Sequence, residues 1–178
     1  MPVYDRLALE QILIAVSELL RSTAPRHALI GGVAVMYYAS RAYTQDVDFL
    51  VAYGPGEKER LAQLAQDKGW TVERKGPWHL RIHCFGTFAD LVDAEVPLQI
   101  GAADDARAIE TATGVVRITP VEHLVALKVL ADRPRDRADI AIIADECADI
   151  DVAKVNELLA PFGESWSPRD WSGSCAVG

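Results

Sequence analysis

The chain has 178 residues, of which 50% are hydrophobic and 25% are charged, a profile typical of one globular domain with a full core. Its formal net charge of −8 excludes the broad basic surface of a general nucleic-acid-binding protein, although it leaves room for a local basic patch. The same charge suits a cationic small molecule or a basic protein partner.

The cysteines argue against a disulfide-rich or zinc-binding protein. Cys84, Cys147 and Cys175 are odd in number and widely spaced, so they suggest neither a disulfide framework nor a zinc knuckle. The first residues mix charged with apolar side chains, unlike a signal peptide, and no apolar run is long enough to cross a bilayer. We therefore expect a cytoplasmic protein with no membrane association.

The first half of the chain is predicted to alternate helices and strands. Apolar residues at helical spacing predict an amphipathic helix from about Asp5 to Arg21. The elements expected next are a strand at 27–30, a helix at 33–40, a strand at 46–51, a helix at 57–68, and strands at 70–74, 78–85 and 88–92. Gly86-Thr87 is predicted to form the hairpin turn between the last two strands.

The second half is predicted to be helical. Thr119 is expected to cap a helix that runs to about Ala131, with Pro120 in its first turn and Glu122 completing a capping box. Pro134 separates it from expected helices at 136–146 and 151–159, and residues 165–178 suggest an irregular tail. The sequence thus predicts one α+β domain over residues 1–164. A small mixed sheet would lie within 27–118, with flanking helices and a C-terminal helical cluster within 119–160.

The Gly31-Gly32 pair lies where a strand is expected to turn into a helix. Glycines let the backbone turn tightly and approach a ligand closely, and the N-terminus of the following helix attracts phosphate. A Gly-Gly turn also serves simply to pack a strand against a helix. This pair alone therefore does not decide between a nucleotide site and a packing device.

Asp46 and Asp48 are spaced so that a strand would present both carboxylates on one face. The interpretation as a solvated strand face is the usual one for an isolated Asp-x-Asp. Here apolar residues at 47 and 49–51 indicate a buried strand, and buried carboxylates need a partner. A hard divalent cation such as Mg²⁺ or Mn²⁺ is the natural partner for such a pair.

A third carboxylate would complete a site for two metal ions. Asp90 is the best candidate because apolar residues flank it within a predicted strand, whereas Asp93 is the alternative and marks the expected strand end. With two ions, one can lower the pKa of an acceptor hydroxyl and the other can hold a triphosphate and its leaving pyrophosphate. Asp90 could also take the hydroxyl proton as general base.

These features together resemble a known family. The segment LIGGVAVMYYASRAYTQDVDFLV, residues 29–51, resembles the signature of polymerase β-like superfamily nucleotidyltransferases, in which a Gly-Gly or Gly-Ser turn and a helix precede Arg, Thr and Asp-x-Asp. The segment TPVEHLVALKVLADRPRDRADI, residues 119–140, is similar to a helix and an Arg-x-x-Asp-x-x-Asp run of the AbiEii-type toxin group and related bacterial nucleotidyltransferases. The resemblance implies the polymerase β-like fold.

The resemblance also implies roles for individual residues. Asp46, Asp48 and Asp90 would hold two Mg²⁺ ions. Nucleotide binding would involve the following residues: Gly31 and Gly32 at the phosphate turn, Arg41 and Thr44 in the loop before the metal strand, and Lys128 near the phosphates. Many family members have Ser after the first glycine, and backbone N–H groups would take its place at Gly32.

The function expected from this resemblance is transfer of a nucleoside monophosphate from an NTP to an acceptor hydroxyl, with release of pyrophosphate. A toxin-type enzyme would act on tRNA or another RNA and be paired with an antitoxin. An aminoglycoside-type antibiotic nucleotidyltransferase would act on a cationic small molecule. A catalytically silent member would instead bind a nucleotide or a protein. A homodimer or a partner chain could complete the cleft of such a short chain.

Overall fold

Seven strands form the central sheet of this computed structural model, which describes residues 6–40, 44 and 46–171. The strands are β1 (His27–Ile30), β2 (Val47–Val51), β3 (Thr71–Arg74), β4 (His79–Cys84), β5 (Thr87–Asp93), β6 (Arg107–Glu110) and β7 (Val115–Ile118). The helices are α1 (Arg6–Thr23), α2 (Gly31–Tyr38), α3 (Glu57–Asp67), α4 (Pro97–Asp104), α5 (Val121–Ala131), α6 (Pro134–Glu146), α7 (Val152–Leu159), the 3₁₀ turn η1 (Ala160–Phe162) and α8 (Pro168–Trp171).

The sheet is mixed, with the strand order β3-β4-β5-β2-β1-β7-β6. β3, β4 and β5 form an antiparallel meander, and β5 then pairs with β2 in parallel. β1 is antiparallel to β2 and parallel to β7, which pairs with β6 in an antiparallel hairpin. The predicted α+β architecture with a mixed sheet is therefore confirmed.

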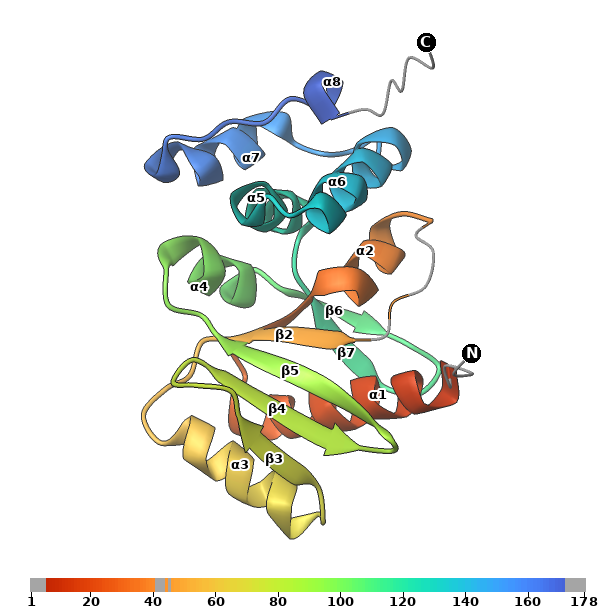
Figure 1. Cartoon of the computed structure of the whole chain (residues 1–178), viewed down its shortest axis with the longest axis vertical. Coiled ribbons are helices and arrows are strands. Elements are labelled where there is room, and N and C mark those ends of the chain that lie inside the picture. The colour runs from red at the N-terminus through yellow and green to blue at the C-terminus, as the bar shows by residue number, and fades with distance from the viewer. Residues whose placement is uncertain (1–5, 41–43, 45, 172–178) are drawn as a thin grey trace.

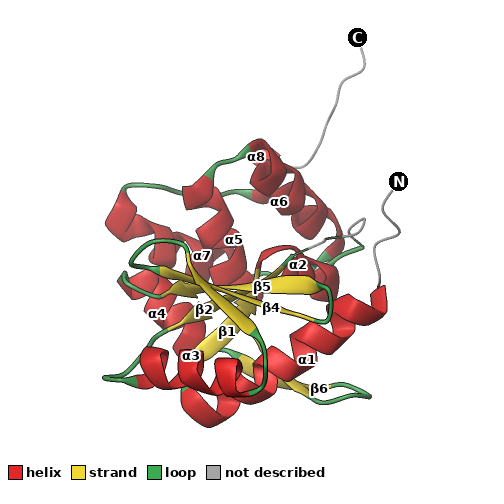
Figure 2. Ribbon diagram, turned by 60° about the horizontal axis from the view of Figure 1, so that its bottom comes forward, coloured by secondary structure: helices red, strands yellow, loops and turns green. Residues whose placement is uncertain are grey.

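Helices cover both faces of the sheet (Figure 1). α1 and α3 lie on one face, α2 and α4 lie on the other, and α5 to α8 stack beyond α2 and α4 as a C-terminal cluster (Figure 1). Figure 2 shows the same strands enclosed between the two groups of helices. Among the described residues, we find no helix that combines the length and the apolar character needed to span a bilayer.

Strand alternation in β2 separates the core from the candidate site. Val47, Phe49 and Val51 are fully buried and belong to the main hydrophobic core. Asp48 and Leu50 point to the opposite face, where they line a cavity. The period of two in a strand thus places apolar side chains in the core and a carboxylate in the cavity.

Two local predictions were wrong. The hairpin turn lies at Phe85-Gly86 rather than Gly86-Thr87, and both turn residues have positive φ, 53° and 74°, as a two-residue hairpin turn of type I′ requires. Thr119 does not cap α5, because its N–H bonds to the Leu29 carbonyl and its own carbonyl accepts the Tyr38 hydroxyl. These bonds hold Thr119 as a continuation of β7, and its hydroxyl has no hydrogen-bond partner in the described part of the chain.

Other elements were not predicted, or differ from the prediction. The elements α4, β6 and β7 were not predicted, because they are short and lack clear periodicity. Pro134 is the first residue of α6 rather than a separator before it. The predicted irregular tail begins instead with Trp166, which is buried beside the Asn156 amide, and with the short helix α8. Residues 172–178 of that tail lie outside the described residues.

Candidate active site

The parallel pairing of β2 and β5 brings two aspartates side by side. Asp48 and Asp90 are direct register partners, and Asp46 precedes β2 by one residue. All three line one cavity of about 400 Å³, together with Gly31 and residues of α5 and α6. The structure thus brings together the three carboxylates that the sequence singled out. Asp93, the alternative third acid, ends β5 and forms an ion pair with Lys58.

Gly31 forms the wall of the cavity next to Asp48. Its φ is +66°, and a Cβ built on it would lie 2.1 Å from Asp48 Oδ2. Only glycine allows both the positive φ and this close approach. The N-terminus of α2 begins here, so the partial positive charge of the helix start lies at the carboxylate cluster. Gly32 is buried within α2 and does not line the cavity.

The charged form of Asp48 is disfavoured in the folded protein. The pKa of Asp48 is raised to about 6, first by burial and then by the neighbouring Asp90 and Asp46, while Arg135 and Lys128 act in the opposite direction. The raised pKa means that the folded chain binds a proton there more readily than the unfolded chain does. A bound cation would relieve the same repulsion.

Replacement of Asp48 by Asn is therefore expected to stabilise the metal-free protein at neutral pH. The pKa of Asp48 is raised from 3.8 to about 6, so its carboxylate costs stability as the pH rises through this range. At pH 8, Asp48→Asn should gain about 2–3 kcal/mol in the free energy of unfolding, and the gain should vanish near pH 4. Denaturant unfolding at both pH values measures this, with the exposed Asp145→Asn as control. A gain that does not depend on pH would contradict it.

Asp90 is already paired with cationic and donor groups on β4. Arg81 donates from Nε to Oδ1 and from Nη2 to Oδ2, each at 2.7 Å, and His79 Nε2 lies 2.7 Å from Oδ1. Burial alone would raise the pKa of Asp90, but the hydrogen bonds from Arg81 and His79 outweigh it and hold the pKa below its usual value. Asp90 is thus held as a carboxylate.

The donor chemistry of the cluster fits a hard divalent cation. Asp46, Asp48 and Asp90 supply oxygen ligands of the kind that Mg²⁺ and Mn²⁺ prefer, and their mutual repulsion favours a cation between them. As the side chains are oriented, no three His, Cys, Asp or Glu residues in the described part of the chain lie close enough together to hold a metal ion. Asp90 would join such a site only after its contacts with Arg81 and His79 change.

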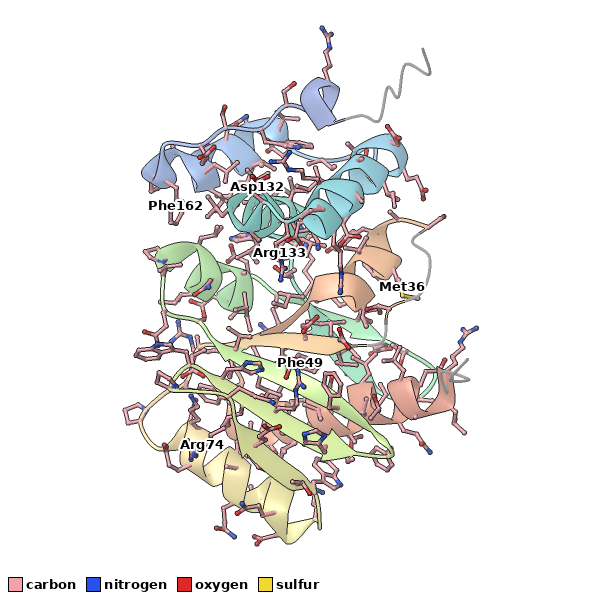
Figure 3. The ribbon with its side chains drawn as sticks, in the orientation of Figure 1. Met36, Phe49, Arg74, Asp132, Arg133 and Phe162 are labelled. Carbon is pink, nitrogen blue, oxygen red and sulfur yellow. The ribbon has the colours of Figure 1, made fainter. Side chains whose placement is uncertain are left out.

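The C-terminal helices give the cavity a basic wall. Lys128, Arg133 and Arg135 line it from α5, the α5–α6 connection and α6. Figure 3 shows Arg133 between the C-terminal helices and the sheet. Lys128 is buried, and its ammonium donates to Asp136 at 3.1 Å and to Asp139 at 2.7 Å. Its charge is therefore largely matched by two carboxylates of α6, while its place in the lining keeps it at the cavity.

Thr44 and Arg41 are the remaining residues that the sequence predicted for the site. Thr44 is buried, its hydroxyl has no hydrogen-bond partner among the described residues, and it is not part of the cavity lining. Arg41 lies outside the described residues. The roles of Thr44, Arg41 and Lys128 in nucleotide binding stay predictions.

Sequence reasoning missed several residues of the site. Arg133 and Arg135 line the cavity, but in the sequence Arg133 was noted only as the first residue of the Arg-x-x-Asp-x-x-Asp run, and neither arginine was predicted to have a role in the site. Gln99 comes from α4, a helix that was not predicted. The contact between Arg81 and Asp90 depends on the hairpin register, which a correctly placed turn would have given.

Comparison with known proteins supports the fold. No protein-family model and no curated protein matches the sequence. The solution structure of the antibiotic-resistance factor ANT(2'')-Ia matches with a TM-score of 0.56 and 17% identity over 90% of this chain and 93% of that chain. A crystal structure of ANT(2'')-Ia in complex with adenylyl-2''-tobramycin gives a TM-score of 0.56 with 16% identity, covering 88% of this chain and 97% of that one.

A further solved structure is also similar. The lincosamide antibiotic adenylyltransferase LnuA, bound to lincomycin, matches with a TM-score of 0.52 and 16% identity, over 78% of this chain and 95% of that chain. At these identities the likeness establishes the nucleotidyltransferase fold, which confirms the fold expected from the resemblance. The closer relation to the AbiEii-type group stays a prediction.

Proposed function

We propose that this chain transfers a nucleoside monophosphate from an NTP to an acceptor hydroxyl and releases pyrophosphate. The observation that carries the proposal is the register pairing of Asp48 with Asp90, beside Asp46 and a glycine that touches Asp48, in one cavity. Acidic and basic residues face each other across this cavity. The arrangement suits a substrate whose phosphates are held by cations at one wall and by metal-bound carboxylates at the other.

The chemical step is a substitution at the α-phosphorus. The acceptor oxygen forms a bond to phosphorus, the bond to the bridging oxygen of the pyrophosphate breaks, and the acceptor proton passes to a base. We propose Asp90 as this base, and Asp46, Asp48 and Asp90 as ligands of two Mg²⁺ ions, for which Mn²⁺ could substitute. When bound, the ions supply Lewis-acid stabilisation of the triphosphate and a lower pKa for the acceptor hydroxyl.

Residues of the chain itself would position the nucleotide. Gly31 and the N-terminus of α2 would contact a phosphate through backbone N–H groups, since the glycine leaves the space beside Asp48 open. Arg133 and Arg135 would contact the triphosphate from the opposite wall, because planar guanidinium groups match phosphate oxygens. Lys128 would set the position of this wall through its two aspartates.

A cationic small molecule is the acceptor we favour. The net charge of −8 would attract a cation, and ANT(2'')-Ia, which was solved with adenylyl-2''-tobramycin, is matched over nearly its whole length. The alternative is a toxin-type enzyme that modifies tRNA or another RNA and pairs with an antitoxin. Its support is the segment 119–140, which resembles the AbiEii-type group. We propose a cytoplasmic location in either case, since the three cysteines are odd in number and widely spaced and so suggest no disulfide framework.

Transfer of labelled nucleotide tests this proposal. The protein is incubated with each α-labelled NTP and Mg²⁺, with an aminoglycoside panel in one arm and total RNA in the other. Label on a small molecule supports the favoured acceptor, and label on RNA supports the toxin-type enzyme. Label on neither, with protein that is folded and all four NTPs present, would count against nucleotidyl transfer.

Asp46→Asn is the variant that ties any activity to the cluster. Transfer is expected to fall at least about a hundredfold, because a catalytic metal contributes several kcal/mol and 1.4 kcal/mol is a factor of ten. The rate of label transfer at saturating Mg²⁺ measures the loss. Asp145→Asn, which removes an exposed carboxylate from α6, should keep the parent rate. Equal rates in both variants would remove Asp46 from the site.

A further inference from the structure

Arg81 takes up two of the acceptor positions on the third carboxylate that a metal ion would use. It lies directly opposite Asp90 in the β4–β5 pairing and donates two hydrogen bonds of 2.7 Å to it. With His79, it uses Asp90 Oδ1 twice and Oδ2 once. Each carboxylate oxygen has about two acceptor positions, so one position on Oδ2 is left.

The guanidinium is held in this place from several sides. Its central carbon lies 3.8 Å from the centroid of the Phe88 ring, a stacking contact that favours a fixed orientation. The Arg81 side chain is only 24% exposed, and β4 lies between β3 and β5 in the sheet. A fixed bidentate pair of this kind is stronger than a surface ion pair. The Arg81 guanidinium therefore has a fixed position beside Asp90.

The Arg81–Asp90 pair affects the charge balance around Asp48. Asp48 and Asp90 are neighbours, and Asp90 is one of the groups that raise the pKa of Asp48. Arg81 acts on the other member of the pair, since its hydrogen bonds and charge hold the pKa of Asp90 below its usual value. A cation approaching Asp90 also meets the positive charge of Arg81, which opposes its binding.

We propose that Arg81 and a divalent cation compete for Asp90, so that Arg81 is a positioning residue that controls occupation of the second metal position. This inference rests on the proposed function, which places metal ions at the three aspartates. The first ion binds at Asp46 and Asp48 while Arg81 stays on Asp90. The second ion binds only when the guanidinium withdraws, which frees Asp90 both as a ligand and as the proposed base.

Binding of Mn²⁺ without any nucleotide tests the competition. Titration calorimetry and the electron paramagnetic resonance signal of unbound Mn²⁺ give the number and affinity of bound ions. The parent is expected to bind one Mn²⁺ well and a second weakly. Arg81→Gln should tighten the second site at least about tenfold, as expected when a group that interacts directly with a ligand residue is changed. Arg81→Lys keeps the charge but loses the bidentate guanidinium, so its affinity for the second Mn²⁺ should lie between those of the parent and Arg81→Gln.

Two further variants control the experiment. Arg74→Gln removes a cation from the exposed end of β3, in the lower part of the sheet (Figure 3), and should bind Mn²⁺ like the parent. Adding Asp90→Asn to Arg81→Gln should abolish the gain, since the freed ligand is then gone. Circular dichroism shows that each variant is folded, and Arg81→Lys supplies the test if Arg81→Gln is not.

The possible results distinguish failure of the Arg81 competition from failure of the proposed nucleotidyl transfer. Second-site affinity that is unchanged or weaker in Arg81→Gln and Arg81→Lys, with the first site intact, overturns the competition and leaves nucleotidyl transfer standing. A gain that survives Asp90→Asn also overturns it, because the ion would then bind elsewhere. Absence of Mn²⁺ binding in the parent and in every Arg81 variant overturns the competition and the proposed metal site together.

Discussion

Replacement of Lys128 by Met is expected to lower the free energy of unfolding by about 3–5 kcal/mol, because it removes a buried counter-ion from Asp136 and Asp139. The Lys128 ammonium lies between Asp136 and Asp139, and the exposed fractions of the three side chains are 7%, 2% and 3%. Met fills a similar volume, so the loss comes from charge rather than from packing. Arg133 still pairs with Asp136, which limits the damage at that carboxylate.

Thermal and denaturant unfolding at pH 7 measure this loss, with an expected fall in melting temperature of about 10 °C. Lys154→Met is the matched control. Lys154 pairs with Glu157 at 3.6 Å, but both side chains are largely exposed, so its removal should change stability by no more than about 0.5 kcal/mol. Adding Asp139→Asn to Lys128→Met should recover part of the loss. Equal stability of Lys128→Met and the parent would show that the ion pairs contribute nothing.

Replacement of Gly31 by Ala is expected to cost about 2–5 kcal/mol, from left-handed backbone strain and from overpacking. The new methyl group would lie 2.1 Å from Asp48 Oδ2, and the residue would keep a φ of +66°. The Asp48 side chain must move or the turn must open. Either change displaces a carboxylate of the proposed metal site, so Mg²⁺-dependent transfer should fall along with stability.

Gly56→Ala separates the two causes. Gly56 has a φ of +74°, but a Cβ on it would meet nothing within 4 Å. It should therefore show the backbone strain alone, about 1–2 kcal/mol, and keep the parent's activity. Denaturant unfolding of both variants gives the comparison. If Gly31→Ala lost no more stability than Gly56→Ala and kept its activity, Gly31 would be a turn residue with no part in the site.

The sequence predicted those features of the site that depend on local patterns and not those that depend on contacts between distant segments. Asp46 and Asp48 could be found because their spacing and apolar neighbours are local. Asp90 could be found because it is a charged residue within an apolar strand. Their proximity in space follows from the parallel pairing of β2 with β5, a contact between distant segments that the resemblance implied and that strand periodicity alone does not give.

The partner of Asp90 was missed through a shift of one residue. A turn at Gly86-Thr87 would have placed His83 opposite Asp90, whereas the turn at Phe85-Gly86 places Arg81 there. The true turn uses Phe85 with a φ of 53°, which a bulky side chain rarely adopts, so turn propensities favoured the wrong pair. Local preferences therefore predicted the hairpin but misjudged the charge balance of the site.

The same limits explain the fold. The long helices α1 and α3 were predicted within a few residues, α1 from its apolar periodicity and α3 as a charged surface helix that ends before Gly69. The short elements α4, β6 and β7 depend on tertiary packing for their stability, and their four to eight residues hold too little pattern to identify them. Thr119 was expected to cap α5 because its sequence context matched a capping box, but contacts with β1 and α2 determine its conformation.

The cavity has its floor on the sheet and its roof on α5 and α6. A molecule bound there would contact the sheet and the C-terminal helices at the same time. Its binding free energy would then add to the cohesion of the two layers, since whatever binds the assembled cavity also resists its separation. The packing of α5 and α6 on the sheet would therefore become more stable as the cavity is occupied. Amide hydrogen exchange in α5 would slow when a ligand of the cavity is bound.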